Sequence, residues 1–392
     1  MTSEWNHFAL GEITELVIDY RGKTPKKLGG DWCKQGYRAL SAKNIKTGRI
    51  VQAETIRYID ESLYRKWMKD EVQRGDILIT SEAPFGQIFF WDSDEKIVLS
   101  QRLFCVRIKP EYDARFIYYY MTTPEFQSEL DGRATGTTVI GLRQPELMKC
   151  IIRCPEIQEQ KVIAAILSSI DAKIIANEKV NDNLHQQAAA LFSSLYDRSN
   201  TEVRFTDLIQ ILGGGTPKTG ENTYWNGNIA FFTPKDVGIP YTLITEKTIS
   251  KEGLSHCNSR LYPVNTVFVT ARGTVGKVGM SGVPMAMNQS CYALVGKETH
   301  QLLVYFYTLK AVDRLKHKAS GAVFDAITTR DFESEQIMKL SDDDATAFLR
   351  VAEPMFQEVL NNNIENLRLS TLRDSLLPKL MSGEIDVSAV QL

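Results

Sequence analysis

In this chain of 392 residues, the residues best suited to bind a ligand lie in two sets of loops that combine glycine with basic and amide side chains. Residues 22–26 read Gly-Lys-Thr-Pro-Lys, and residues 214–218 read Gly-Gly-Thr-Pro-Lys. Lysine and arginine neutralise phosphates, while arginine and glutamine can form paired hydrogen bonds with guanine and adenine in the major groove. The residue types therefore favour contact with DNA.

Further basic and amide residues occur at matching places in two copies of the same region. The candidate DNA contacts are Lys23, Thr24, Lys26, Lys43, Gln101, Arg102, Arg133 and Arg143 in the first copy, and Thr216, Lys218, Lys235, Arg272, Lys277, Gln289 and Lys318 in the second. Taken singly, such a residue is more often an ordinary solvated loop residue. The copies also differ, because Glu82 corresponds to Arg272 and Arg102 to Ser290. Two domains that read different DNA sequences would share the positions of their contact residues but differ in some of the residue types, as these two copies do.

Catalytic motifs are not found in the sequence. Residues 22–24 resemble the end of a phosphate-binding loop, but Val17 stands where that motif requires glycine. The five histidines have no metal-ligand spacing, and His185 is expected on the outside of a helix. We expect the six cysteines to be free thiols, and the sequence lacks the Asn-Pro-Pro-Tyr type of motif with which amino-methyltransferases grip a flipped base. The expectation is therefore no catalytic residue, no metal and no cofactor bound by this chain.

Two long helices are expected to organise the chain around these loops. In residues 156–196, apolar residues recur at alternating steps of four and three, the heptad pattern of a coiled-coil seam, and the pattern recurs 185 residues later. A helix of about forty residues, roughly 60 Å long, cannot bury such a stripe alone. We therefore expect the helices to pair. The predicted seam residues are Ile163, Leu167, Ile170, Ile174, Asn177, Asn181, Leu184 and Leu191 in the first helix, and Met355, Val359, Asn362, Asn366, Leu369, Leu376 and Leu380 in the second.

Two asparagines interrupt each seam at matching positions. Antiparallel packing would place Asn177 near Asn366 and Asn181 near Asn362, with an approximate two-fold axis close to them. A buried polar pair at a seam costs stability but fixes register and orientation. The alternative is that the helices splay at this point and the asparagines face solvent.

The regions that precede the helices also repeat each other. Residues 75–80 followed by Gly86 correspond to residues 265–270 followed by Gly276, each a β-branched strand that runs into a glycine turn. Trp32 likewise corresponds to Trp225. We predict an α+β protein in which two mixed α/β domains, rich in strands and turns, alternate with two helices that form an antiparallel coiled coil with pseudo-two-fold symmetry. The predicted boundaries are 1–154 for the first domain, 155–200 for the first helix, 201–341 for the second domain and 342–392 for the second helix and tail.

Composition and charge agree with this organisation. The net charge is −2, and the hydrophobic and charged fractions are ordinary for a soluble protein. The two domain regions are mildly basic whereas the helical regions are acidic, so a polyanion would prefer the domains, although ordinary surface charge explains the difference equally well. The first residues include no apolar run long enough for a signal peptide or a membrane span, and we expect a cytoplasmic protein without a membrane partner.

The helix motifs add a more specific signal. The first helix opens with Pro-Glu-Ile-Gln-Glu-Gln-Lys at 155–161 and continues with Ile-Leu-Ser-Ser-Ile-Asp at 166–171 and Ala-Ala-Ala-Leu-Phe at 188–192. The second ends with Leu-Arg-Asp-Ser-Leu-Leu-Pro-Lys-Leu-Met-Ser-Gly-Glu-Ile at 372–385. Together these motifs resemble the specificity (S) subunits of type I restriction-modification systems, over the whole chain. One departure is that residues 341–344 read Ser-Asp-Asp-Asp where the first helix has its opening motif.

The resemblance implies a non-catalytic, DNA-binding subunit. Two target recognition domains would each read one part of a split, asymmetric site in double-stranded DNA, and the two spacer helices would set the distance between the parts. Two modification subunits would carry S-adenosylmethionine and methylate adenine, and a restriction subunit would translocate and cut DNA. Two other classes of protein stay open: a self-contained DNA methyltransferase or nuclease, and a coiled-coil scaffold with two domains that bind a sugar or a peptide. The missing cofactor and catalytic motifs speak against the first.

Overall fold

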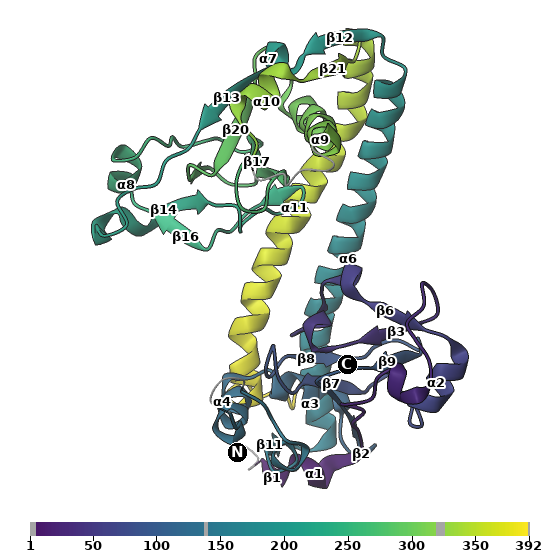
Figure 1. Ribbon diagram of the computed structural model, residues 1–392. Helices are drawn as coiled ribbons and strands as arrows, with labels where there is room; N and C mark the ends of the chain where they lie inside the picture. Colours follow the sequence, from purple (N-terminus) through teal and green to yellow (C-terminus); the bar gives the residue numbers. More distant parts are fainter. Residues whose placement is uncertain (1–4, 137–139, 319–325, 391–392) are drawn as a thin grey trace. The chain divides into compact units, whose positions relative to one another are not determined.

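The computed structural model describes residues 5–136, 140–318 and 326–390. The chain divides into two compact units: unit 1 comprises residues 1–172 and 370–392, and unit 2 comprises residues 173–369. Each unit combines a strand-rich domain with one part of each of two long helices (Figure 1).

Unit 1 is built from small sheets covered by short helices. Its strands are β1 (Asn6–Ala9), β2 (Thr14–Ile18), β3 (Tyr37–Leu40), β4 (Ile45–Lys46), β5 (Arg49–Ile50), β6 (Arg57–Ile59), β7 (Ile77–Thr80), β8 (Ile88–Phe90), β9 (Ile97–Leu99), β10 (Leu103–Ile108) and β11 (Ile151–Cys154). Its short helices are α1 (Leu10–Ile13), η1 (Lys26–Leu28), η2 (Ala42–Asn44), η3 (Ala53–Thr55), α2 (Glu61–Trp67), α3 (Ala114–Met121), α4 (Pro124–Arg133) and α5 (Gln144–Leu147). The sheets have the strand orders β2-β10-β7-β8, β6-β3-β9, β1-β11 and β4-β5.

Unit 2 repeats this plan. Its strands are β12 (Thr201–Arg204), β13 (Ile209–Gly213), β14 (Trp225–Phe232), β15 (Tyr241–Thr242), β16 (Lys247–Ile249), β17 (Val267–Thr270), β18 (Val278–Ser281), β19 (Met285–Met287), β20 (Cys291–Gly296) and β21 (Gln336–Lys339). Its short helices are α7 (Phe205–Leu208), η4 (Asn222–Tyr224), α8 (Lys251–Ser255), α9 (Gln301–Lys318) and α10 (Thr329–Ser334). The sheets have the orders β13-β20-β17-β18-β15, β16-β14-β19 and β12-β21. Strand β14 pairs antiparallel with β16 and parallel with β19, as β3 does with β6 and β9, so the topology confirms the repeat.

Glycines at matching positions make the same turns in both units. Gly86 and Gly276 both follow a buried strand with positive φ angles of 68° and 74°, a conformation that favours glycine. Gly36 and Gly227 both lie against a neighbouring strand end, where a Cβ atom would come within 2.3 Å of the Ile59 carbonyl oxygen and 2.5 Å of the Ser250 Cα, respectively. The sequence alignment of the two copies is therefore correct at these turns.

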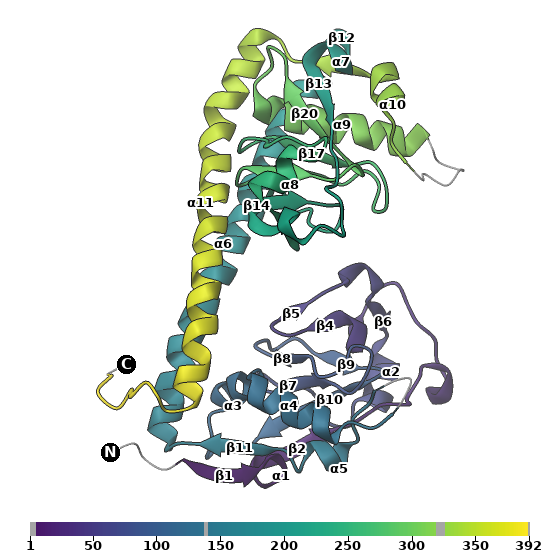
Figure 2. The same ribbon diagram turned by 90° about the vertical axis from the view of Figure 1, so that its left-hand side faces the viewer.

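The predicted seam residues lie on the inner faces of the long helices α6 (Ile157–Asp197) and α11 (Asp342–Met381), and each of them is buried or partly buried. In unit 1, Ile163, Leu167 and Leu380 pack into the core of the domain. In unit 2, Val359 packs into the core of the second domain. The helices α6 and α11 lie side by side in this unit (Figures 1 and 2). Burial of both apolar stripes explains why these two segments are stable as long helices.

The seam asparagines pair as antiparallel packing predicts. In unit 2, the amide nitrogen of Asn177 donates to the Asn366 Oδ1 at 2.8 Å, and the amide nitrogen of Asn362 donates to the Asn181 Oδ1 at 2.9 Å. Asn181 in turn donates to Asn363 at 2.9 Å. The alternative in which the helices splay and these asparagines face solvent is wrong, because Asn177, Asn181 and Asn362 are buried.

This cluster allows a test of the pairing by double substitution. Replacing Asn181 alone with leucine should lower the free energy of unfolding by about 1–3 kcal/mol, because the buried amide of Asn362 loses its acceptor. Replacing both Asn181 and Asn362 with leucine should recover most of this loss, since no buried amide is then left unpaired. Denaturant titrations of the two single variants and the double variant measure the coupling; purely additive losses would contradict the pairing.

Polar contacts tie α6 to the domain of unit 1. The buried Gln160 accepts a hydrogen bond from the backbone N–H of Asp113 at 2.9 Å, and Asp113 caps the N-terminus of α3. The carboxylate of Asp171 accepts a hydrogen bond from the hydroxyl of Tyr119 at 2.6 Å and another from the guanidinium of Arg373, on α11, at 2.8 Å. These contacts, together with apolar packing, fix both helices in unit 1.

The expectation that His185 lies on the outside of the helix is wrong. Its Nε2 lies 3.0 Å from the hydroxyl of Tyr305, and its ring packs against Phe306 and Phe356. This partial burial lowers the pKa of His185. Since α9 supplies Tyr305 and Phe306, a second face of α6 is covered by the domain of unit 2 in addition to the seam (Figure 1).

Candidate nucleic-acid interface

The turn between β9 and β10 presents two of the predicted DNA contacts where two sheets of unit 1 meet. The carbonyl of Gln101 accepts the N–H of Ala42, just after β3, at 3.1 Å, and the carbonyl of Arg102 accepts the N–H of Ser81, just after β7, at 2.9 Å. Arg102 itself adopts a positive φ of 66°. The backbone of this turn is therefore held by both sheets, while the side chains of Gln101 and Arg102 are exposed.

Unit 2 has the same turn between β19 and β20. The N–H of Asn288 donates to the Phe232 carbonyl at 3.0 Å, and the Ser290 carbonyl accepts the N–H of Ala271 at 2.8 Å. Gln289 is exposed at the position that corresponds to Gln101. Both units thus present a glutamine from a turn that is anchored between two sheets.

A cleft of about 320 Å³ lies beside the turn of unit 1. It brings the predicted contacts Lys43 and Gln101 together with Trp32 and Arg57, which were not predicted as site residues. Backbone and side-chain polar groups line the rest of the cleft, including Ser41, whose N–H donates to Asn44 Oδ1 at 3.1 Å. The cleft therefore places the Gln101 amide and two cations, Lys43 and Arg57, around an aromatic side chain.

A cation over a tryptophan recurs in the two units. The guanidinium carbon of Arg57 lies 5.3 Å from the ring centre of Trp32, and the Nζ of Lys247 lies 5.7 Å from that of Trp225. Both cations sit on matching strands, β6 and β16, and both are exposed. The repeated tryptophans were the signal in the sequence that could have pointed to these two residues.

The loops at 22–26 and 214–218 contribute unequally. The ammonium of Lys23 donates to the Trp67 carbonyl at 2.7 Å and lies 3.8 Å from the ring centre of Tyr20, and partial burial lowers its pKa. Lys26 and Lys218 are exposed, whereas Thr24 is half-buried. In unit 2, the hydroxyl of Thr216 is hydrogen-bonded to Gln289, so this loop joins the glutamine turn.

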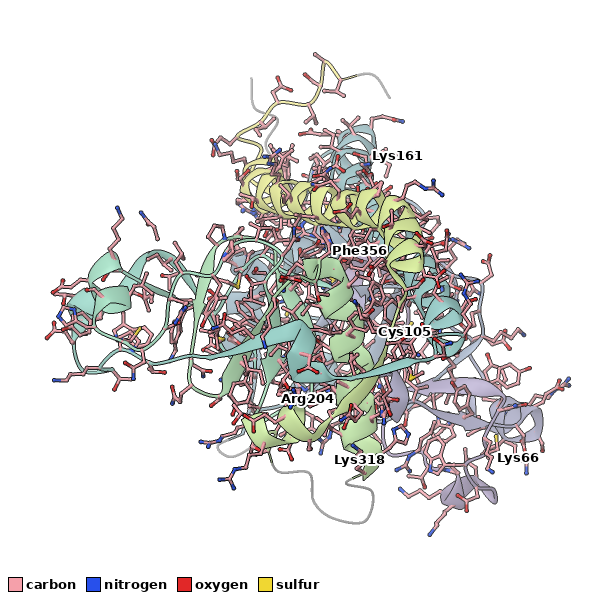
Figure 3. All side chains as sticks on the ribbon, turned by 90° about the horizontal axis from the view of Figure 1, so that it is seen from above. Lys66, Cys105, Lys161, Arg204, Lys318 and Phe356 are labelled. Carbon is pink, nitrogen blue, oxygen red and sulfur yellow. The ribbon has the colours of Figure 1, made fainter. Side chains whose placement is uncertain are left out.

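Arg133 and Lys318 are among the predicted contacts that form ion pairs within the chain. Arg133 pairs with Glu129 at 2.9 Å and lies 3.7 Å from Glu146. Lys318, at the C-terminal end of α9 (Figure 3), pairs with Glu335, whose side chain is fully buried. Substituting Lys318 would therefore disturb a buried carboxylate. These two cations have a structural role in the structure as it stands.

The remaining predicted contacts lie near the turns or on nearby surface. The N–H of Leu142 donates to the Ser81 carbonyl at 3.0 Å, which places the exposed Arg143 beside the turn of unit 1. The N–H of Arg272 lies 3.3 Å from the Ser290 carbonyl, beside the turn of unit 2. Lys277 is exposed in the same domain. Lys235 is also exposed, with its Nζ 3.7 Å from Glu246.

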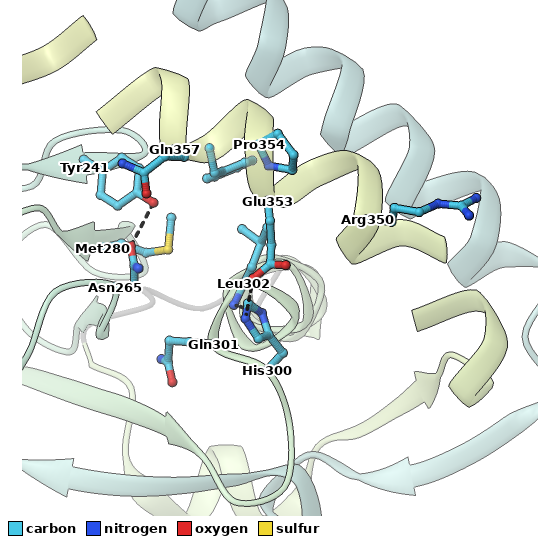
Figure 4. A pocket seen from close by; sticks show the side chains of 11 residues that line it. Tyr241, Asn265, Met280, His300, Gln301, Leu302, Arg350, Glu353, Pro354 and Gln357 are labelled. Carbon is cyan, nitrogen blue, oxygen red and sulfur yellow. Dashed lines mark hydrogen bonds and ion pairs between the residues drawn. The ribbon is translucent and has the colours of Figure 1, made fainter. Parts of the chain in front are cut away.

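A cavity of about 450 Å³ in unit 2 lies between the start of α9 and α11 (Figure 4). Four of its polar residues form two pairs: Tyr241 donates to Asn265 at 2.9 Å, and His300 lies 2.8 Å from Glu353. The side chain of Arg350 points away from the other labelled residues (Figure 4). The cavity is therefore lined by a mixture of polar and apolar side chains.

The described ranges 5–136, 140–318 and 326–390 contain neither a metal-ligand cluster nor a membrane-spanning helix. Within them, no group of three or more His, Cys, Asp or Glu side chains is arranged to hold a metal ion. Burial raises the pKa of the Cys150 and Cys154 thiols to about 12, so both are protonated at neutral pH. No helix in the same ranges is long and apolar enough to cross a membrane.

Comparison with known proteins matches both strand-rich domains to the same family model. A family model described as "Type I restriction modification DNA specificity domain" matches residues 2–186 and 198–339. The two matched segments correspond to the two strand-rich domains, and the first match also includes residues 157–186 of α6. They cover well over half of the chain.

Individual relatives carry the same description. The chain is 23% identical over 406 residues to the type I restriction enzyme HindI specificity subunit from Haemophilus influenzae, covering 81% of this chain and 88% of that protein. It is 22% identical over 341 residues to the MjaIX specificity subunit from Methanocaldococcus jannaschii, covering 80% and 78%. The crystal structure of the S subunit of a type I system from M. genitalium has a similar fold, with a TM-score of 0.60 and 16% identity over 96% of both chains.

Proposed function

We propose, because this chain belongs to the family of type I restriction modification DNA specificity proteins, that its two units read the two parts of a split, asymmetric site in double-stranded DNA. The observation that carries the proposal is the repeated turn. Each unit presents an exposed glutamine, Gln101 or Gln289, from a backbone anchored between two sheets. Glutamine can make a paired contact with adenine in the major groove.

Shared and differing residues suggest a division of labour within each unit. The basic residues that recur, Lys43 with Lys235 and Arg57 with Lys247, suit contacts with phosphates, which are the same in every sequence. The residues that differ at the turns suit base reading, because each unit would then prefer a different sequence. Phosphate contacts would also make binding weaken as salt rises.

Methyl transfer and cleavage belong, in this proposal, to other subunits. Two modification subunits, which carry S-adenosylmethionine and methylate adenine, would bind the long helices, and a restriction subunit would join the complex. Large apolar side chains that remain exposed on these helices support protein partners: Ile175 and Val180 on α6, and Val351 and Leu372 on α11. The chain itself is proposed to be non-catalytic.

The purified chain alone is expected to transfer no methyl group to DNA. Incubation of the chain and DNA with labelled S-adenosylmethionine should leave DNA unlabelled, and addition of the modification subunit of the same system should label adenine. As a control, the same preparation should bind DNA with an affinity that falls as salt rises. Label in DNA without any partner would contradict the proposal, and an absence of DNA binding at every salt concentration would favour the scaffold.

A further inference from the structure

The turn of unit 1 carries an ion pair that unit 2 does not repeat. The Nε of Arg102 lies 2.9 Å from the Oε1 of Glu82, which follows β7. The corresponding residues in unit 2 are Ser290 and Arg272, so a carboxylate occupies this place only in unit 1. The side chains of Arg102 and Glu82 are 47% and 34% exposed, and both are accessible to a ligand.

Stability does not explain the pair well. Ion pairs at this degree of exposure contribute little to folding, since water and salt screen them. A carboxylate at a surface that meets DNA also repels phosphates. The remaining effect of Glu82 is on the position of the Arg102 side chain.

The geometry suits such positioning. The backbone of Arg102 is fixed, because its carbonyl accepts the Ser81 N–H at 2.9 Å, and Ser81 is the residue before Glu82. The Glu82 carboxylate lies beside Gly141, where a Cβ atom would come within 3.5 Å of its Oε2. Both members of the pair are therefore anchored through the same strand end.

The carboxylate lies on the Nε side of the guanidinium. The two terminal nitrogens, Nη1 and Nη2, are then the groups that remain for a ligand. Two parallel N–H groups match the O6 and N7 acceptors of guanine in the major groove. A free arginine side chain would lose more conformational freedom on making this contact than one that is already held.

We propose that Glu82 is a positioning residue that holds Arg102 for a paired hydrogen-bonded contact with one guanine in the half of the site read by unit 1. This inference rests on the proposed function and adds to it a base and a residue pair. In unit 2, Ser290 cannot make that contact, and the arginine comes from a different strand end, so the second half of the site has a different base at the corresponding position.

Binding of the full chain to a pool of randomised duplexes, followed by sequencing of the bound fraction, tests the inference. Arg102→Lys keeps the charge but not the paired donors, and should reduce the preference for guanine at one position by about 5- to 150-fold. Glu82→Gln should reduce the same preference by at least about fivefold. Glu82→Gln should leave binding to random DNA unchanged or tighter, because it removes a negative charge; a variant that merely unfolded unit 1 would bind more weakly.

Glu95→Gln is the matched control. Glu95 also contacts the Nε of an arginine, Arg38, at 2.6 Å, but it precedes β9 whereas the turn follows that strand. Removing the Glu95 carboxylate should leave the preference for a base unchanged at every position of the site. An unchanged guanine preference in Glu82→Gln, or the same loss in Glu95→Gln, would overturn the positioning role. If the wild-type protein enriches no sequence at all, the proposed function fails. If the wild-type protein shows a sequence preference and the Arg102 and Glu82 variants show the same preference, only this inference is refuted.

Discussion

Adding one heptad to both long helices, after Ala172 and after Leu369, should lengthen the unread gap of the DNA site by about three base pairs. Seven residues add about 10 Å of helix. They rotate the part of the helix beyond the insert about the helix axis by about 20° less than two full turns. DNA rises about 3.4 Å per base pair. If the paired helices set the spacing between the two half-sites, both half-sites should keep their sequence while the gap between them grows.

These insertion points follow from the structure. They fall where the chain passes from one unit to the other, and the two inserts face each other in the antiparallel register of Asn177 with Asn366. Each insert should carry leucine at its two seam positions. The matched control is the same insert in α6 alone, which leaves seven residues without a partner and should abolish recognition of the longer site. A variant with both inserts that methylates the original site with the original gap would show that the helices do not set the spacing.

An insertion nearer the start of α6 would not give the same information. Gln160 bonds to Asp113, and Ile163 and Leu167 are buried in the core of unit 1. An insert after Gln158 would displace these contacts and destabilise the domain as well as moving it. The heptad pattern could not reveal this, because it reports that a residue is buried but not what covers it.

The sequence predicted the pairing of the helices because the signal is periodic and local. The asparagines were informative for the same reason: two amides in each seam can pair only in one antiparallel register, and Asn177 and Asn181 do so with Asn366 and Asn362. The repeat predicted the sheets through strands and glycine turns. The order of residues along the chain was therefore sufficient to predict the paired helices and the repeated sheets.

Features that join distant segments were not predictable in this way. His185 was placed on the outside of α6 because α9, which covers it, contributes its aromatic residues from another part of the chain. Lys318 was predicted as a DNA contact, and its ion pair with Glu335 was missed because Glu335 lies on a different element. Arg133 was different, since Glu129 stands four residues earlier on the same helix and i,i+4 spacing predicts such a pair.

Replacing one glutamine in each unit should alter one half of the site at a time. Gln101→Ala should relax the preference at one position in one half, and Gln289→Ala should do so in the other half, each by about 1–3 kcal/mol for a lost paired contact. The two variants are matched controls for each other, because both glutamines occupy the same place in the repeated turn. Gln289 also bonds to Thr216, so Thr216→Val tests whether loss of that hydrogen bond alone accounts for any effect.

The two units are proposed to read separate halves of one DNA site. Sequencing of methylated adenines in DNA from cells that carry the modification subunit with wild-type protein, Gln101→Ala or Gln289→Ala tests this proposal most directly. The predicted result is a site of two short specified runs separated by a fixed number of unspecified pairs, with the first variant relaxing one run and the second variant relaxing the other. A single continuous site, or both variants relaxing the same run, would contradict the proposal.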